Sequence, residues 1–492
     1  MRKFHYIISL SILLVLLNQC KPTEEKNLLI QNATIIDGTG ADRFVGSLRI
    51  KGSLIIDIGD LTVFDTDSII DGTGMILSPG FIDTHSHHDG DTLRTVEAAI
   101  SQGITTIIVG QDGFSRPSLS NYFDSLKTSP LSLNIASYVG HNTVRQKVMG
   151  NDFKREATID EIEAMKKLIA RDMQSGALGL STGLEYDPGI YSNTQEVIEM
   201  AKVASQYGGR YISHMRSEDM YLEQSIDEIL RVGKETNMPV QISHFKLARK
   251  GLWGKAAKIL TILDSARSDG IDVTADIYPY QYWQSTMTVL FPKRDFDNRE
   301  SAAFALSELT TPEGVIVNKF NANPIYEGLT LKEIADLRKE DAVTTFITLI
   351  KMSQETPGES IIAKSMDLED IKTLSRWPHI NLCSDGAPSG HPRGWGAFPR
   401  YLNMDTGESL ETKIHKMTTQ AAENMGIDSI GIIKEGYYAD LLLFGIESFK
   451  DKATFKESTL KAEGLHKVIV SGKVVFQNKA PTMIYSGRVL KN

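Results

Sequence analysis

The sequence predicts an α/β fold in which a (β/α)8 barrel of the TIM type carries a small β-sandwich domain built from both chain ends. Three observations lead to this prediction. The middle of the chain alternates short apolar runs with amphipathic stretches of helical period, polar residues follow the ends of several runs, and both chain ends carry β-rich runs and turns. Alternating strand and helix patterns indicate βαβ units, and eight such strands fit a closed barrel better than an open sheet.

The predicted barrel strands lie in a segment that we place at residues 79–429. They cover residues 80–84, 105–110, 133–139, 177–181, 210–213, 240–243, 273–278 and 380–384. The clearest helix covers residues 159–174, with Thr158 as its N-cap and Glu161 completing a capping box. About a hundred residues separate the last two strands, which is far beyond a normal connection and predicts an insertion at about residues 287–375.

The two chain ends predict one small β domain made of residues 27–78 and 430–492. Both segments alternate short β-rich runs with turns, and Ser471-Gly472 forms a hairpin-like turn between two such runs. Because similar patterns flank a different middle, we expect the two ends to meet in space.

Residues 1–26 are predicted to lie outside the fold. A basic start, an apolar run over residues 6–17, and Cys20 followed by a polar linker resemble a bacterial lipoprotein signal, in which the cysteine becomes the lipidated first residue. The apolar run is short for a membrane span. We therefore expect a protein of the bacterial cell envelope, held by a lipid anchor on the periplasmic or surface side. The alternative is a plain signal peptide and a secreted protein, since Gln19 stands where a small residue is usual.

Charge and cysteine content narrow the class of protein. The formal net charge is −9 and no basic stripe is visible, which disfavours nucleic acid as a partner. Apart from Cys20, the chain has only Cys383, so a cysteine-rich zinc site and a structural disulfide in the mature chain are excluded. Any metal must be held by histidines and carboxylates. We expect a small-molecule substrate, and nothing in the sequence predicts an oligomeric state.

Histidines and one aspartate follow the ends of four predicted barrel strands. His85 and His87 follow the first strand, where residues i and i+2 point to the same side. His214 follows the fifth strand, His244 the sixth and Asp385 the eighth. Barrel enzymes place their active sites at the carboxyl ends of the strands. Four imidazoles and a carboxylate converging there suit zinc or a similar divalent ion.

Several runs of residues resemble a known family. Residues 79–87, Pro-Gly-Phe-Ile-Asp-Thr-His-Ser-His, are typical of the amidohydrolase superfamily. Longer runs resemble its D-aminoacylase (N-acyl-D-amino-acid deacylase) branch, at residues 140–145, 180–186, 213–216, 242–246, 384–386, 391–400, 436–441 and 487–490. The resemblance covers residues 27–492. It implies metal-dependent hydrolysis of the amide bond of N-acyl-D-amino acids.

The resemblance also implies a tight zinc site and a second, weaker metal position. The implied ligands are His214, His244 and Asp112 for the first, and His85, His87 and Asp385 for the second. The branch usually has a cysteine where this chain has Asp112. An aspartate can replace a thiolate as an anionic ligand, and it is harder and could bridge two metals. The alternative is that Asp112-Gly113 is only a turn. Residues 177–183 contain no lysine, so a carboxylated lysine ligand on the fourth strand is not expected.

Further residues have implied roles in catalysis and substrate binding. Asp385 is expected to take the proton of the attacking water and later give a proton to the leaving amine. Lys246, two residues past His244, is well placed for a substrate carboxylate. The substrate-binding candidates are Tyr186, Lys246, Tyr278, Arg393 and His141. For His141, a buried strand-end histidine without such a role is an equal alternative.

Two other readings of the function stay open. One is a related amidohydrolase reaction, either cleavage of dipeptides ending in a D-residue or opening of a cyclic amide; the missing lysine argues against cyclic amides. The other is a non-enzymatic binding protein of the cell envelope. All the predicted histidine ligands and Asp385 are present, which argues against a protein that only binds its ligand.

Overall fold

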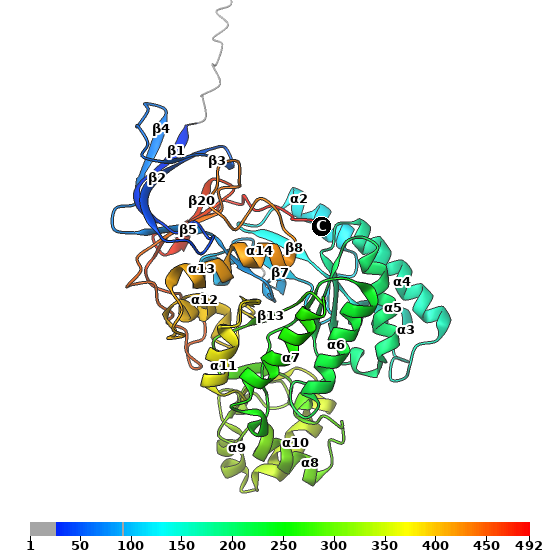
Figure 1. Ribbon diagram of the computed structural model, residues 1–492. Coiled ribbons are helices and arrows are strands. Elements are labelled where there is room, and N and C mark those ends of the chain that lie inside the picture. The colour runs from blue at the N-terminus through cyan, green and yellow to red at the C-terminus, as the bar shows by residue number, and fades with distance from the viewer. Residues whose placement is uncertain (1–25, 91–92) are drawn as a thin grey trace, which may run out of the picture.

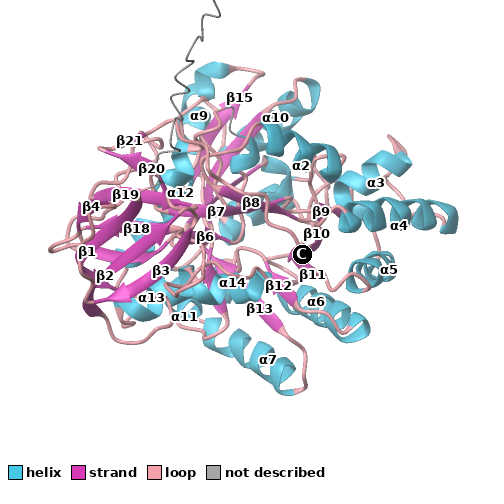
Figure 2. Ribbon diagram, turned by 90° about the horizontal axis from the view of Figure 1, so that it is seen from above, coloured by secondary structure: helices cyan, strands magenta, loops and turns pink. Residues whose placement is uncertain are grey.

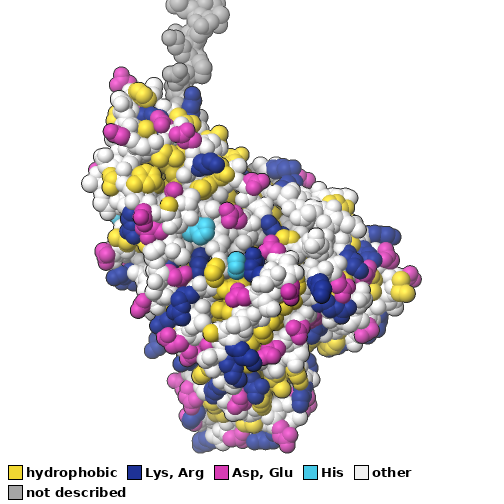
Figure 3. All heavy atoms as spheres, viewed as in Figure 1, with side chains coloured by type: hydrophobic (Ala, Val, Ile, Leu, Met, Phe, Trp, Pro, Cys, Tyr) yellow, Lys and Arg dark blue, Asp and Glu magenta, His cyan; other side chains and the backbone are white. Residues whose placement is uncertain are grey.

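The computed structural model of the protein describes residues 26–90 and 93–492. The predicted lipoprotein-type signal, with Cys20, lies outside the described residues. Within them, no helix combines the length and the apolar character that crossing a membrane requires. On the face shown in Figure 3, acidic and basic side chains are interspersed over the surface.

Among the described residues, nine short parallel strands form the barrel. They are β6 (Phe81–Asp83), β7 (Ile104–Val109), β8 (Asn134–Ser137), β9 (Val139–Gly140), β10 (Gly179–Gly183), β11 (Arg210–His214), β12 (Val240–Ile242), β13 (Val273–Ile277) and β17 (Ile380–Leu382). The strands β6-β7-β8 pair in one arc, and the strands β9-β10-β11-β12-β13-β17 pair in a second arc. Figure 2 shows the two arcs from above.

The two arcs join at both ends and close the ring. On one side, only Tyr138 separates β8 from β9, so the two strands are one stretch of chain that takes a single position in the ring. On the other side, Ser86 and Gly386 form a parallel bridge, and the Asp385 N–H donates to the His85 carbonyl oxygen at 2.9 Å. The predicted (β/α)8 barrel is therefore confirmed, with β8 and β9 as its third strand.

Helices cover the outside of the barrel (Figure 1). They include α2 (Leu119–Thr128), α3 (His141–Met149), α4 (Ile159–Gln174), α5 (Thr194–Ser205), α6 (Leu222–Thr236), α7 (Ala256–Ser268), α11 (Leu368–Ser375), α12 (Arg393–Asn403), α13 (Leu410–Met417) and α14 (Thr419–Met425). Helix α4 begins as predicted, because the Thr158 hydroxyl accepts from the Glu161 N–H and the Glu161 carboxylate accepts from the Thr158 N–H at 2.7 Å. Apolar side chains such as Met165 and Ile229 pack inward against strand residues such as Leu180.

A separate unit stands between β13 and β17, at the foot of the view in Figure 1. Its antiparallel sheet has the order β14-β16-β15, with β14 (Tyr282–Ser285), β15 (Val315–Phe320) and β16 (Glu359–Lys364). Helices α8 (Arg299–Phe304), α9 (Leu331–Arg338) and α10 (Ala342–Glu355) pack against it. We call these residues, 282–364, the inserted unit.

The chain ends form one mixed sheet beside the barrel. In the described part of the chain it has nine strands, β1 (Asn27–Ile35), β2 (Phe44–Lys51), β3 (Leu54–Gly59), β4 (Asp67–Asp71), β5 (Ile76–Pro79), β18 (Leu441–Phe444), β19 (Leu465–Val470), β20 (Lys473–Gln477) and β21 (Ala480–Pro481). The two ends meet where β5 pairs antiparallel with β18. The predicted β-sandwich is thus one continuous sheet, which folds over a core that includes Ile30, Leu77 and Leu441. The Ile55 N–H donates to the Tyr437 carbonyl oxygen at 2.9 Å and ties the folded halves together.

Candidate active site

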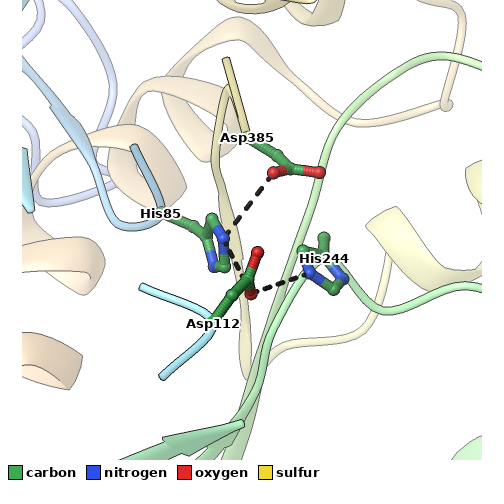
Figure 4. Close-up of side chains that lie close together, drawn as sticks. All are labelled: His85, Asp112, His244 and Asp385. Atoms are coloured by element: carbon green, nitrogen blue, oxygen red, sulfur yellow. Dashed lines mark hydrogen bonds and ion pairs between the residues drawn. The ribbon is translucent and has the colours of Figure 1, made fainter. Parts of the chain in front are cut away.

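The six predicted metal ligands converge at the carboxyl ends of the barrel strands. His85 and His87 follow β6, Asp112 follows β7, and His244 follows β12. His214 is the last residue of β11, and Asp385 follows β17. Figure 4 shows four of these side chains pointing toward one another. The parallel ring brings them together, because it places every strand's carboxyl end on one face.

Three of these residues have a left-handed backbone. The φ angles are 54° at Asp112, 37° at His244 and 46° at Asp385. Such values are uncommon for residues other than glycine and cluster at functional sites. Buried partners hold two of these turns. The Asp276 carboxylate accepts from the His244 N–H at 2.5 Å, and the His85 carbonyl accepts from the Asp385 N–H at 2.9 Å. The fold therefore imposes these conformations, which aim the side chains inward.

The turn at Asp112-Gly113 is present, so the turn and ligand interpretations of Asp112 do not exclude each other. Gly113 has φ 76°, and a Cβ there would lie 2.3 Å from the Asn142 side-chain oxygen. A glycine is therefore required after Asp112. The tight turn presents the Asp112 carboxylate to the histidines.

One group of donor atoms lies around His85 and His87. The His85 Nε2 atom is 3.4 Å from Asp112 Oδ1 and 3.6 Å from Asp385 Oδ1. The His87 Nε2 atom is 3.4 Å from Asp112 Oδ2 and 3.3 Å from Asp385 Oδ1. Two imidazole nitrogens and two carboxylates thus face a common centre.

A second group lies around His214 and His244. Their ring nitrogens, Nδ1 of His214 and Nε2 of His244, are 3.0 Å apart. Asp112 Oδ1 is 3.3 Å from His244 Nε2 and 3.8 Å from His214 Nδ1. The carboxylate of Asp112 therefore belongs to both groups.

The donor atoms fit a zinc-type ion. Four ligands at about 2.0–2.1 Å in a tetrahedral site lie roughly 3.3–3.4 Å from one another, close to the distances within each group. The fully buried ring nitrogens of His85 have no hydrogen-bond partner in the described structure. A buried imidazole without a partner is costly, and a metal bond would satisfy it. His, Asp and Glu side chains are the ligands that such an ion takes when cysteine is absent.

The electrostatics of the cluster favour a positive charge at its centre. Burial disfavours the charged form of Asp112, yet the surrounding imidazoles, His85 first, hold the pKa of its carboxyl well below its usual range. Burial and the Lys246 ammonium oppose a charge on His244, but nearby carboxylates, Glu218 foremost, raise the pKa of His244 to about 10. The carboxylates thus attract either protons on the imidazoles or a metal cation.

Two carboxylates that the sequence analysis did not assign brace the histidines from behind. Glu218 Oε1 lies 3.0 Å from His244 Nδ1, and its Oε2 accepts from Lys246 Nζ at 2.6 Å. Glu185 Oε2 lies 2.8 Å from His214 Nε2. Carboxylates in this position fix the orientation and tautomer of metal-binding histidines. Glu185 stands inside a run that the sequence analysis singled out, and Glu218 follows His214 by four residues, so a search for carboxylates near the strand-end histidines would have found both.

Three of the substrate-binding candidates, Tyr186, Lys246 and Arg393, line a cavity of about 290 Å³ together with His87, His214, His244 and Asp385. The Arg393 Nη1 atom lies 2.7 Å from Asp385 Oδ2. Tyr278 does not line this cavity. Its ring packs under Arg393, whose guanidinium carbon is 4.5 Å from the ring centroid.

His141 lies apart from the other candidates. It is the first residue of α3, it is fully buried, and its Nε2 atom is 2.9 Å from Glu196 Oε1. It is not among the residues that line the cavity. The arrangement matches the alternative in which His141 is a satisfied strand-end histidine.

A parallel barrel with this cluster at its carboxyl-end face is typical of metal-dependent hydrolases. A profile of the amidohydrolase family (Amidohydro_3) matches residues 321–476. The chain is 34% identical to a D-aminoacylase of Alcaligenes xylosoxydans xylosoxydans, over 94% of this chain and 97% of that protein. It is 32% identical to an N-acyl-D-glutamate deacylase of the same organism, over 95% and 97%.

Solved structures agree with these relatives. A crystal structure of D-aminoacylase superposes with a TM-score of 0.85 at 32% identity and covers 94% of this chain and 99% of that one. An N-acyl-D-glutamate deacylase from Bordetella bronchiseptica, complexed with zinc and a phosphonate inhibitor, has a TM-score of 0.85 at 29% identity, covering 95% and 100%. The chain belongs to the amidohydrolase family, in its D-aminoacylase branch.

Proposed function

We propose that the protein hydrolyses the amide bond of N-acyl-D-amino acids. The observation that supports this proposal is the combination, in one cavity, of a metal-binding cluster, the Asp385 carboxylate and two cationic side chains, Lys246 and Arg393. The relatives named D-aminoacylase and N-acyl-D-glutamate deacylase support the substrate class and the D configuration. The residues of the cavity do not by themselves determine whether the D or the L enantiomer is the substrate.

The residues that would hold zinc are His85, His87, Asp112, His214, His244 and Asp385. When bound in such a site, zinc lowers the pKa of a bound water toward neutrality and polarises a substrate carbonyl. Glu185 and Glu218 keep the imidazoles of His214 and His244 in place. They do so by contacting the ring nitrogens that face away from the cluster.

Asp385 is suited to the role of general base and acid. Burial disfavours its charge, but the Arg393 guanidinium and the neighbouring imidazoles hold the pKa of its carboxyl below its usual range. It is therefore a carboxylate at neutral pH and can accept a proton from the attacking water. The same carboxyl group can then give this proton to the leaving amine.

Lys246 and Arg393 are the cations that a substrate carboxylate would meet. Each is buried, and each now pairs with a carboxylate of the protein, Lys246 with Glu218 and Arg393 with Asp385. A substrate carboxylate that adds to or replaces one of these partners is anchored at a fixed distance from the metal cluster. The anchors orient the scissile amide toward Asp385.

The proposal is tested with matched pairs of N-acetyl-D- and N-acetyl-L-amino acids, assayed with added zinc. We expect hydrolysis of the D substrates and a loss of at least a hundredfold in kcat for Asp385→Asn assayed at saturating zinc. A preference for L substrates would refute the assignment of the D configuration. Full activity of metal-free protein would refute the metal-dependent mechanism.

A second candidate, cleavage of dipeptides with a C-terminal D-residue, has support from a neighbouring cavity. This cavity of about 450 Å³ shares Glu185 and Val289 with the walls of the first cavity. It offers room for an acyl group larger than acetyl. Dipeptides of the form L-Ala-D-Xaa, assayed beside the N-acetyl-D compounds, distinguish the two activities by their kcat/KM.

We also propose that the protein is anchored in the bacterial cell envelope through a lipid on Cys20. The support is the sequence alone, namely a basic start, the apolar run over residues 6–17 and the cysteine that follows it. The variant Cys20→Ala should leave the membrane fraction or remain unprocessed. Equal membrane association of both forms would refute the anchor.

A further inference from the structure

We infer that the substrate's side chain is apolar and that substrates with an acidic side chain are rejected. This inference rests on the proposed function and adds the class of amino acid to it. Sequence identity does not decide between the classes, because the D-aminoacylase and the N-acyl-D-glutamate deacylase are 34% and 32% identical to this chain. The lining of the cavity does decide between them.

The inserted unit gives the cavity an apolar wall. The side chains of this wall are those of Trp283, Val289, Leu290 and Leu309. All four belong to one buried apolar cluster, which also includes Phe346 of α10 and Ile361 of β16. Because close packing in this core holds the side chains, the wall is a fixed surface of the cavity.

One hydroxyl group positions two members of the wall. The Ser365 hydroxyl accepts from Trp283 Nε1 at 2.8 Å and donates to the Leu309 carbonyl oxygen at 2.7 Å. The indole N–H is the one hydrogen-bond donor of a tryptophan side chain, so it is not available to a substrate. The four side chains of the wall therefore offer a substrate apolar contacts and no partner for a carboxylate.

Such a wall distinguishes substrates by the length of their apolar side chain. In an apolar pocket, one methylene group more or less changes kcat/KM by roughly 10- to 200-fold. Leucine and phenylalanine side chains can cover the wall, whereas the methyl group of alanine covers little of it. We therefore expect the longer apolar substrates to react faster than the alanine compound.

The charges of the lining disfavour an acidic side chain. Among the described residues that line the cavity, the lysines and arginines are Lys246 and Arg393, which already pair with carboxylates at 2.6 and 2.7 Å. The described lining also carries five carboxylates, those of Asp112, Glu185, Glu218, Asp219 and Asp385. Two of the five are candidate metal ligands, and the other three still outnumber the two cations. A second carboxylate on the substrate would add to this excess in a partly buried site, which is costly.

Asp219 shows that the lining already disfavours anions. Its side chain is buried, and burial together with the nearby Glu185 carboxylate raises the pKa of Asp219 to about 6. A substrate carboxylate in the same cavity would meet the same two effects, which are the loss of water and the repulsion by neighbouring carboxylates.

Two arginines of the neighbouring cavity do not supply the missing cation. Arg216 donates to Glu228 from both Nε and Nη2 at 2.9 Å. Arg294 donates from Nη1 to the Thr288 carbonyl oxygen at 2.7 Å and from Nη2 to the Glu185 carbonyl oxygen. Both arginines line the second cavity and not the first. The preference thus follows from the lining of the first cavity itself.

The first test compares substrates on the zinc-loaded parent protein. It measures kcat/KM for N-acetyl-D-leucine and N-acetyl-D-phenylalanine and for the N-acetyl derivatives of D-glutamate and D-aspartate. We expect a preference of at least about a hundredfold for the apolar substrates. Faster hydrolysis of the acidic substrates would overturn this inference and leave the proposed function standing. Failure to hydrolyse any N-acyl-D-amino acid would instead refute the proposed function and this inference with it.

The variant Leu309→Ala tests the wall. It should lower kcat/KM for the leucine and phenylalanine substrates about tenfold and for N-acetyl-D-alanine much less. The matched control is Leu337→Ala, at a leucine of α9 that is 63% exposed, and it should change neither value. Thermal melts report whether each variant is folded. An equal loss on all three substrates would overturn the contact between the wall and the substrate's side chain.

The variant Thr286→Arg tests the charges without disturbing the core. Thr286 is an exposed residue of the inserted unit that lines the cavity. An arginine at this position supplies a cation, so it should narrow the preference for apolar over acidic substrates tenfold or more. Thr286→Gln lengthens the side chain without a charge, and it should keep the preference of the parent protein. A preference that Thr286→Arg leaves unchanged would overturn the electrostatic part of the inference.

Discussion

Replacing Lys246 with methionine separates two roles that the structure gives this side chain. Lys246 Nζ lies 2.6 Å from Glu218 Oε2 and 2.7 Å from His244 Nδ1, and its side chain is only 6% exposed. It is placed both to bind a substrate carboxylate and to balance the charge of Glu218 behind a metal-binding histidine. Methionine keeps most of the side-chain volume and removes the charge.

The expected loss follows from the kind of contact that is removed. A charge-assisted hydrogen bond between the ammonium and a substrate carboxylate contributes about 1.5–3 kcal/mol, or roughly 10- to 150-fold in kcat/KM. The substitution also leaves the buried Glu218 carboxylate with only imidazoles beside it, His244 at 3.0 Å and His214 at 3.8 Å. This second effect acts on the metal cluster, so it should lower the rate equally for charged and uncharged substrates.

The assay compares N-acyl-D-amino acids with their α-amides, which lack the carboxylate. Lys246→Met should lose 10- to 150-fold in kcat/KM on the acids and much less on the amides. The double variant Lys246→Met/Glu218→Gln removes both charges of the pair, and it should keep the difference between acids and amides. The zinc content of each variant is measured beside the rates.

Equal losses on acids and amides would refute the role of Lys246 in binding the carboxylate. In that outcome Lys246 would act only through Glu218, and the double variant should then recover activity on both kinds of substrate.

Four further predictions concern the metal, the pH dependence and the fold. Glu218→Gln should weaken zinc binding about 10- to 100-fold, measured by competition with a chelator, and unchanged binding would contradict its bracing role. Removing the metal should lower the Tm, because zinc binds the folded state only, and zinc but not Mg²⁺ should restore the Tm. Partial burial raises the pKa of Glu359 from 4.5 to about 7, so its neutral form adds stability at low pH that is lost as the pH rises through about 7. Glu359→Gln should therefore be more stable than the parent protein at pH 8 in denaturant unfolding, and an equal or lower stability would contradict this sign. Thr158→Ala should destabilise the protein by about 1 kcal/mol through the loss of the α4 cap, whereas Thr261→Ala, in the middle of α7, should change stability less.

The barrel and the candidate metal ligands were predictable because the patterns that identify them are local in the sequence. The period of the apolar runs marks the strands, and a parallel ring places every residue that follows a strand on the same face, so His85, His214 and Asp385 could be grouped without knowing any distance. The capping box of α4 was predictable because Thr158 and Glu161 lie within one helical turn.

The contacts behind these metal-ligand candidates depend on the paths that the loops take back to the barrel. The periodicity of the sequence does not specify those paths. Glu185 and Glu218 reach His214 and His244 from loops whose paths follow from packing. The pairing of Arg393 with Asp385 and the position of Tyr278 under Arg393 are of the same kind. For His141, the strand-end position left a substrate-binding role and a satisfied buried histidine as equal alternatives, and packing decides its contact, since its side chain meets Glu196 of α5.

The pairing of β5 with β18 has a consequence for how the chain reaches its fold. Ile76 lies opposite Phe444, so the strands made first during synthesis acquire this neighbour only when nearly the whole chain has emerged. Until then β5 keeps an open edge, and contacts so distant in sequence form slowly. An open edge is a template for pairing with other chains. The sheet at the chain ends is thus completed late in folding. The interval before β18 pairs with β5 is the stage at which this protein is most exposed to aggregation.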